Sequence, residues 1–201
     1  MKINDLLNIA HTYGSPVYVY DAQKIASQYN RLTNAFASVP KLRINYAMKA
    51  LSNISILKLM KDLGAGLDTV SIQEVQLGLL AGFDPQQIIF TPNGVSMDEI
   101  EEAMRLGVQL NIDNLSFLEQ FGTQHPEIPV CIRINPHVMA GGNSNISVGH
   151  IDSKFGISIH QIPHILRIVQ NTKMHNNGIK KGWDYLCESF ISLLSLSLGK
   201  R

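Results

Sequence analysis

Strand-like and helix-like segments alternate along this chain of 201 residues, with short connections between them. Six runs are rich in β-branched and aromatic residues, and each is expected to form a strand: 16–21, 43–47, 66–71, 88–93, 108–114 and 130–136. Several of the helices between them are expected to begin at Asp21, Asn53 and Ser96, and two to end at Gly64 and Gly82. Repeated strand–helix units predict an α/β fold with a parallel sheet, either a (β/α)8 barrel or an open doubly wound sheet.

Polar residues at the carboxyl ends of the expected strands favour the barrel, because barrel enzymes collect their catalytic groups at that face. No Gly-x-Gly-x-x-Gly loop follows the first strand, which argues against a dinucleotide-binding sheet. Nearness to solvent explains Ser71 and Asn114, whereas Asp68 and Arg133 lie in apolar runs where an unpaired charge is costly. The full set is Lys49, Asp68, Ser71, Asn93, Asp113, Asn114, Arg133 and Asn135.

Composition argues against several kinds of partner. A formal net charge of +1 gives no electrostatic footprint for nucleic acid or for an anionic membrane. No metal site is expected, because Cys131 and Cys187 lie far apart and His137 and His150 are not at metal-ligand spacing. The N-terminus lacks the apolar core of a signal peptide, so we expect a cytoplasmic protein.

Lys49 lies at the end of the expected strand 43–47, where a lysine can hold an aldehyde cofactor as a Schiff base. Its position alone favours a solvated strand end, since most lysines that follow an apolar strand are of that kind. The surrounding motifs are Tyr-Ala-Met-Lys at 46–49, Gly-Ala-Gly-Leu-Asp-Thr-Val-Ser at 64–71, Arg-Ile-Asn-Pro at 133–136 and Ser-Lys-Phe-Gly-Ile at 153–157. In this order they resemble the barrel domain of the fold-type III pyridoxal-phosphate decarboxylases, which has the alanine racemase type of barrel. Residues 135–156 are most similar to bacterial diaminopimelate decarboxylases.

The resemblance covers about residues 12–179 and implies a role for five residues. It implies that Lys49 holds pyridoxal phosphate, that Asp68 and Glu74 are acids near this lysine, and that Arg133 lies beside the cofactor ring. Ala47 is expected to pack against the cofactor. The alternatives are a strand-end salt bridge between Asp68 and Arg133, a solvated helix charge for Glu74, and a barrel-filling role for Ala47.

The implied reaction is the decarboxylation of meso-2,6-diaminopimelate to L-lysine, the last step of lysine biosynthesis. The implied substrate is therefore a small amino acid, and the intact family works as homodimers. A glycine-rich segment with Gly141, Gly142 and Gly149 could also bind an anion through its backbone amides. Lys154 has a structural or a catalytic role in this reading.

The chain departs from the family pattern after Ile179. The family has a histidine-rich strand, Gly-Ile-His-x-His, and a following Gly-Ser, whereas this chain continues with Lys180 and Lys181. We therefore expect a partial barrel domain at 1–179, lacking the last strands and the C-terminal β-domain, and a divergent tail at 180–201. The pair Cys187 and Glu188 resembles a family motif that lies much further downstream, so we interpret it as a coincidence.

These departures predict a truncated or frameshifted diaminopimelate decarboxylase with little or no activity of its own. Three alternatives stay open: a barrel that binds pyridoxal phosphate without decarboxylating, a related ornithine/arginine-type decarboxylase, and a non-enzymatic fragment that associates with a full-length paralogue.

Overall fold

The computed structural model describes residues 2–40, 42–135, 137 and 156–174. The chain divides into two units, Met1–Leu42 and Arg43–Arg201. The predicted boundary between residues 179 and 180 lies outside the described residues. Predictions for other residues also stay predictions for this reason: Gly141, Gly142, Gly149, His150, Lys154, Cys187 and Glu188.

The first unit contains two helices, α1 (Ile3–Tyr13) and α2 (Ala22–Ala35). Asp21 caps α2 as predicted, since its side chain accepts a hydrogen bond from the Lys24 backbone N–H at 3.0 Å. The predicted strand at 16–21 is wrong, because this segment has no strand and Tyr18 within it is 89% exposed. A strand needs a hydrogen-bonded neighbour. The described part of this unit offers only helices.

The second unit is built on a parallel sheet with the strand order β1-β2-β3-β4-β5. Each strand pairs with the next one along the chain, and a helix lies between each pair, as the sequence predicts. The strands are β1 (Asn45–Ala47), β2 (Gly66–Thr69), β3 (Ile88–Phe90), β4 (Gln109–Ile112) and β5 (Val130–Ile132). The helices are α3 (Ile54–Asp62), α4 (Ile72–Leu80), α5 (Met97–Arg105), α6 (Leu115–Gln124) and, further along, α7 (Ile162–Asn171).

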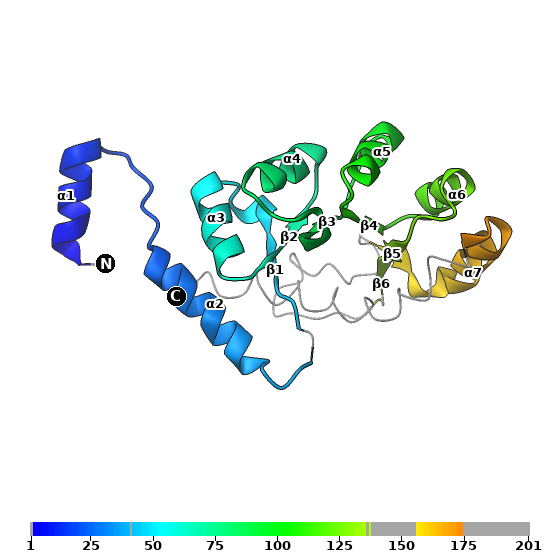
Figure 1. Ribbon diagram of the computed structural model, residues 1–201, viewed down its shortest axis with the longest axis horizontal. Coiled ribbons are helices and arrows are strands. Elements are labelled where there is room, and N and C mark those ends of the chain that lie inside the picture. The colour runs from blue at the N-terminus through cyan, green and yellow to red at the C-terminus, as the bar shows by residue number, and fades with distance from the viewer. Residues whose placement is uncertain (1, 41, 136, 138–155, 175–201) are drawn as a thin grey trace. The chain divides into compact units, whose positions relative to one another are not determined.

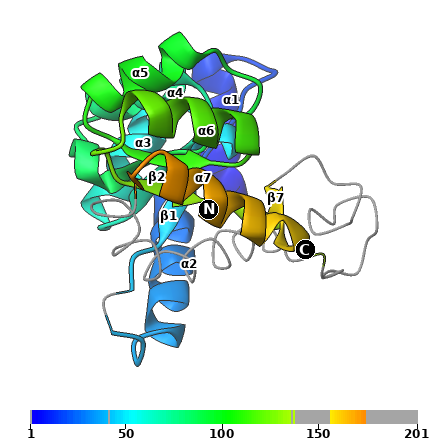
Figure 2. The ribbon, with the colours of Figure 1, turned by 90° about the vertical axis from the view of Figure 1, so that its right-hand side faces the viewer.

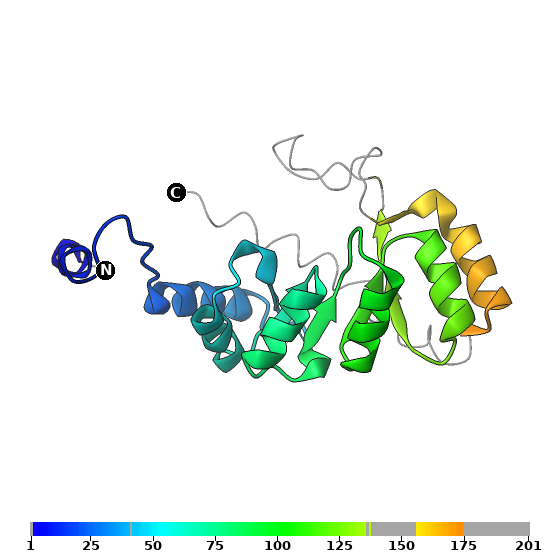
Figure 3. The ribbon, with the colours of Figure 1, turned by 90° about the horizontal axis from the view of Figure 1, so that it is seen from above.

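Helices α3 to α7 lie along one side of the sheet (Figure 1), and the view from above shows them side by side (Figure 3). In a doubly wound sheet the helices cover both faces, whereas in a barrel they form a single outer layer. The arrangement is therefore that of a barrel wall, and the predicted fold class is confirmed. Among the described residues, no helix is long and apolar enough to cross a bilayer.

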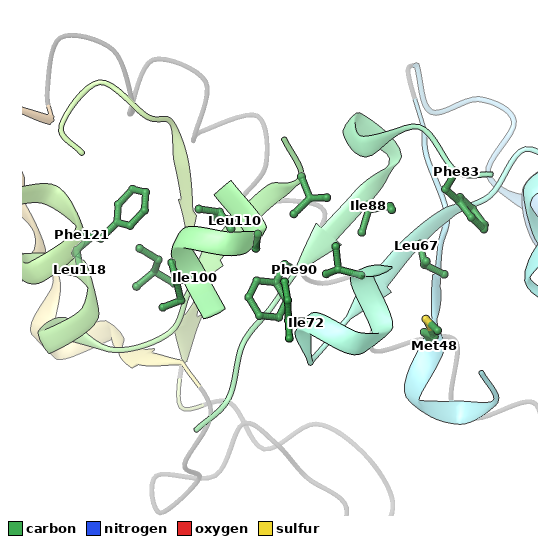
Figure 4. Packing of buried hydrophobic residues seen from close by; sticks show 14 of the residues in the cluster. Met48, Leu67, Ile72, Phe83, Ile88, Phe90, Ile100, Leu110, Leu118 and Phe121 are labelled. Carbon is green, nitrogen blue, oxygen red and sulfur yellow. The ribbon is translucent and has the colours of Figure 1, made fainter. Parts of the chain in front are cut away.

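Alternate residues of the central strands form the core between sheet and helices (Figure 4). Leu67, Phe90 and Ile112 are almost fully buried on this side. Gly78 of α4 allows close packing here, because a Cβ at this position would lie 2.5 Å from Leu67 Cδ2 and 3.2 Å from Ile88 Cδ1. Side chains that alternate with these core residues point to the opposite face of the sheet.

Helix boundaries follow the predicted capping residues. The Asn53 side chain accepts hydrogen bonds from the backbone N–H groups of the first turn of α3, and Ser96 forms a capping box with Glu99 at the start of α5. Gly64 and Gly82 follow α3 and α4 with φ of 87° and 92°, a left-handed conformation that favours glycine.

The predicted strand 130–136 is divided in two. After β5, a short strand β6 (Ile134–Asn135) pairs with β7 (Ile157–Ser158), which precedes α7 (Figure 2). Arg133 joins the two sheets through its backbone. Its N–H donates to the Ile112 carbonyl and its carbonyl accepts from the Ile157 N–H, both at 2.8 Å.

Candidate active site

The predicted site residues Ala47 and Asp68 lie side by side on neighbouring strands. Ala47 of β1 is the register partner of Asp68 of β2, so both side chains lie on the face of the sheet opposite the core. Lys49 follows β1 in a short 3-10 helix, η1 (Met48–Ala50), and is exposed. The amine is therefore at the carboxyl end of the sheet and open to a ligand.

The turn that carries Lys49 is anchored on both sides. Met48 is fully buried in the core, and the Leu51 N–H donates to the Met48 carbonyl at 3.0 Å. The Tyr46 hydroxyl donates to the Leu51 carbonyl, also at 3.0 Å. These contacts fix the backbone around Lys49 while its side chain stays accessible.

Burial and the neighbouring charges both shift the pKa of Asp68. Burial raises the pKa of this carboxyl, while the Thr91 hydroxyl and the positive charges of Lys49 and Arg133 lower it. The charge of Glu74 raises the pKa further. The charges of the other three predicted residues, Lys49, Arg133 and Glu74, thus all act on Asp68.

Glu74 has a second, structural role. Its Oε2 accepts a hydrogen bond from the Val70 N–H at 2.8 Å, and its own N–H donates to the Ser71 hydroxyl at 3.2 Å. Glu74 is half-buried, so its carboxylate is held at the start of α4. A negative charge at this position also stabilises α4, because it lies at the positive, amino end of the helix dipole.

Arg133 is half-buried between β5 and β6, where its backbone holds both sheets. A guanidinium keeps its charge at every relevant pH and binds anions through several N–H groups. Together the arrangement offers a primary amine, a carboxyl of raised pKa and a half-buried cation. A primary amine in such a setting can bond covalently to an aldehyde, and the cation can hold an anionic group of the same ligand.

Two residues of this face have no counterpart among the predicted site residues. The Thr91 hydroxyl donates to Asp68 Oδ1 at 3.1 Å, and Asn111 Nδ2 donates to Thr91 Oγ1 at 3.0 Å. Asn111 is a polar residue between two apolar residues of its strand, which is a signal the sequence contains, whereas Thr91 follows a continuous apolar run and has no such signal.

The other polar strand ends have local roles. Ser71 and Asn114 cap α4 and α6, so nearness to solvent is only part of the reason for their polarity. Asp113 accepts a hydrogen bond from Asn114 Nδ2 at 3.2 Å, and buried Asn135 accepts one from the His137 N–H at 3.0 Å. Asn93 is exposed. Within the described ranges, no group of three or more His, Cys, Asp or Glu side chains could hold a metal ion.

Comparison with known proteins assigns residues 22–180 to a family model described as "Pyridoxal-dependent decarboxylase, pyridoxal binding domain". The chain is 34% identical over 177 residues to a diaminopimelate decarboxylase of Methanothermobacter thermautotrophicus, covering 87% of this chain and 41% of that protein. It is 40% identical over 151 residues to one of Helicobacter pylori strain J99, covering 73% and 37%.

A solved structure gives the same likeness. The crystal structure of diaminopimelate decarboxylase from Helicobacter pylori complexed with L-lysine matches with a TM-score of 0.74 and 32% identity, over 83% of this chain and 43% of that one. The chain therefore spans about 40% of the length of the relatives it matches.

Proposed function

The chain belongs to the pyridoxal-dependent decarboxylases, and on that premise we propose that it holds pyridoxal phosphate at Lys49 for the decarboxylation of an amino acid. The substrate we propose is meso-2,6-diaminopimelate and the product is L-lysine, because the relatives at 34% and 40% identity are diaminopimelate decarboxylases. The proposal rests on one observation: Lys49 follows β1 at the carboxyl end of the sheet, two residues after Ala47, the register partner of Asp68.

The residues present fit this cofactor. Pyridoxal phosphate has an aldehyde, which needs an amine, and a phosphate, which needs a cation or N–H donors. Lys49 supplies an exposed amine on a fixed turn, and Arg133 supplies a half-buried cation, which the resemblance places beside the cofactor ring. Ala47 has the smallest side chain that still has a Cβ, so it leaves room against the sheet for a flat ring.

Each side chain has a defined task in this proposal. Lys49 would hold the cofactor's aldehyde carbon through Nζ, with the aldehyde oxygen leaving as water, and it would return a proton to the substrate carbon after release of carbon dioxide. Asp68 offsets the positive charge of Lys49 and takes up or gives a proton at its carboxyl, since burial keeps its pKa raised. The Arg133 guanidinium holds an anionic group of the ligand near the Asp68 carboxyl. Glu74 fixes the start of α4 next to Asp68.

When bound, pyridoxal phosphate supplies an electron sink for the electron pair that carbon dioxide leaves behind. The protein contributes orientation and charge. The position of Lys49 at the carboxyl end of β1 agrees with the face on which barrel enzymes place their chemistry.

We also propose that the 201 residues taken alone turn over little substrate, because they match only about 40% of the length of the relatives. Robust release of carbon dioxide from diaminopimelate by this chain would contradict the low turnover.

The resemblance also predicts that two copies of the chain pair. Light scattering of the purified chain would test this pairing.

A spectral titration tests both cofactor and substrate. Pyridoxal phosphate added to the chain is expected to give a new absorbance band that is absent in Lys49→Ala. Diaminopimelate should change this band at lower concentrations than ornithine or arginine does. An equal response to all three amino acids would contradict diaminopimelate as the substrate. A band in wild type that no amino acid alters would favour a cofactor-binding barrel without decarboxylase activity.

A further inference from the structure

Two side-chain hydrogen bonds link three neighbouring strands on the face that carries Asp68. Asn111 Nδ2 on β4 donates to Thr91 Oγ1, directly after β3, at 3.0 Å, and Thr91 Oγ1 donates to Asp68 Oδ1 on β2 at 3.1 Å. An ionised carboxylate can only accept hydrogen bonds, so Thr91 must be the donor to Asp68. The hydroxyl has a single proton, so its oxygen is left to accept from the Asn111 amide.

Thr91 is itself held in place. It is 9% exposed, and its backbone N–H donates to the Thr69 carbonyl of β2 at 2.8 Å. Its main chain and its side chain therefore both bind to the strand that carries Asp68. A buried hydroxyl with two partners in fixed directions has little freedom to rotate.

We propose that Thr91 and Asn111 are positioning residues that fix the carboxyl of Asp68 beside Lys49. Their two hydrogen bonds keep Oδ1 on the Thr91 hydroxyl, so a proton that Asp68 takes up resides on Oδ2. The inference rests on the proposed function, in which Asp68 acts on Lys49. Neither Thr91 nor Asn111 touches the reacting atoms in this account, since both act through Asp68.

The first test measures the carboxyl directly. The pKa of Asp68 is followed by ¹³C NMR in the full 201-residue chain without cofactor, and Asp68→Asn identifies its resonance. Thr91→Val removes the hydroxyl that lowers this pKa, so the pKa of Asp68 should rise. Thr91→Ser keeps the hydroxyl and should restore the wild-type pKa.

Thr69→Val is the matched control. Thr69 lies on β2, is fully buried and donates its hydroxyl to the Ile89 carbonyl at 2.9 Å. The same substitution there removes a hydroxyl from the same pair of strands without touching Asp68, so the pKa of Asp68 should not change. An equal pKa in wild type and Thr91→Val, or an equal rise in both valine variants, would overturn the proposal.

Asn111→Ala tests the hydrogen bond from Asn111 to Thr91. It also replaces Thr91→Val if that variant fails to fold. Without the Asn111 amide the Thr91 hydroxyl can turn away, so the pKa of Asp68 should rise, by less than in Thr91→Val. A wild-type pKa in Asn111→Ala would remove Asn111 from the proposal.

The second test uses the rate at which pyridoxal phosphate becomes attached to Lys49. Thr91→Val should slow attachment severalfold, whereas Thr91→Ser and Thr69→Val should not. If wild type itself does not attach the cofactor, the proposed function fails, while the NMR titration still decides the role of Thr91. If wild type attaches it and Thr91→Val matches wild type in both measurements, only the positioning role is overturned.

Discussion

The Glu74 carboxylate accepts a hydrogen bond from the Val70 N–H at 2.8 Å, four residues earlier in the chain. Val70 follows β2 and Glu74 lies in the first turn of α4, so this contact closes the connection between strand and helix. Asp68 lies two residues before Val70. A change at Glu74 therefore acts on the backbone next to the candidate active site as well as on its charge.

Glu74→Ala should lower the free energy of unfolding by about 1–2 kcal/mol, because it leaves the Val70 N–H without its charged acceptor. Glu74→Gln should lower it by less, since the amide oxygen can still accept. Urea denaturation of both variants measures the difference. Equal losses in the two variants would mean that the hydrogen bond contributes nothing and that only the charge matters.

Asp68→Asn should raise the Tm of the cofactor-free chain at pH 7. Burial raises the folded-state pKa of Asp68 above its ordinary value of 3.8, so the folded chain binds this proton more tightly than the unfolded chain. The corresponding stability is fully present below pH 3.8 and is lost as the pH rises through the folded-state pKa. Asparagine avoids this loss and can still accept from Thr91.

Thermal unfolding from pH 7 down to pH 3 checks this prediction, and the advantage of Asp68→Asn should vanish at the acidic end. The opposite trend, with wild type the more stable at pH 7, would show that attraction to Lys49 and Arg133 outweighs burial.

Gly78→Val should lower the free energy of unfolding by about 1–3 kcal/mol, since any side chain at this position meets Leu67 and Ile88. Gln73→Val, at an exposed position of the same helix, is the control and should cost only a few tenths of a kcal/mol. Chemical denaturation compares the two. If both valines have the same effect, α4 does not pack against β2 and β3 as described.

Ser96→Ala should lower the free energy of unfolding by about 1 kcal/mol, because it removes half of the capping box with Glu99. Ser55→Ala, at an exposed position in the first turn of α3, is the comparison and should be neutral or slightly stabilising. A Ser96→Ala variant as stable as Ser55→Ala would exclude a contribution from the cap.

Most of the helices and strands of the barrel wall could be predicted, because their boundaries depend on residues close together in the chain. Asn53 and Ser96 cap helices through their own side chains, and Gly64 supplies a left-handed turn, so each boundary depends on residues close in the chain. The segment 16–21 has the composition of a strand, but pairing depends on distant residues that composition does not reveal.

The candidate active site, too, could be predicted only in part from the sequence. Lys49 and Asp68 stand out as charges at the ends of apolar strands. The link from Asn111 through Thr91 depends on how three strands align, and that register follows only from the folded sheet. A threonine within an apolar run is also an ordinary strand residue, so its type alone does not mark a site.

Attachment of pyridoxal phosphate to Lys49 can be checked by locating the modified residue. The chain is incubated with the cofactor, reduced with borohydride and analysed by peptide mass spectrometry. A pyridoxyl group is expected on the peptide that contains Lys49, far above the level on exposed Lys58, and none at this position in Lys49→Ala. Equal labelling of Lys49 and Lys58 would contradict it.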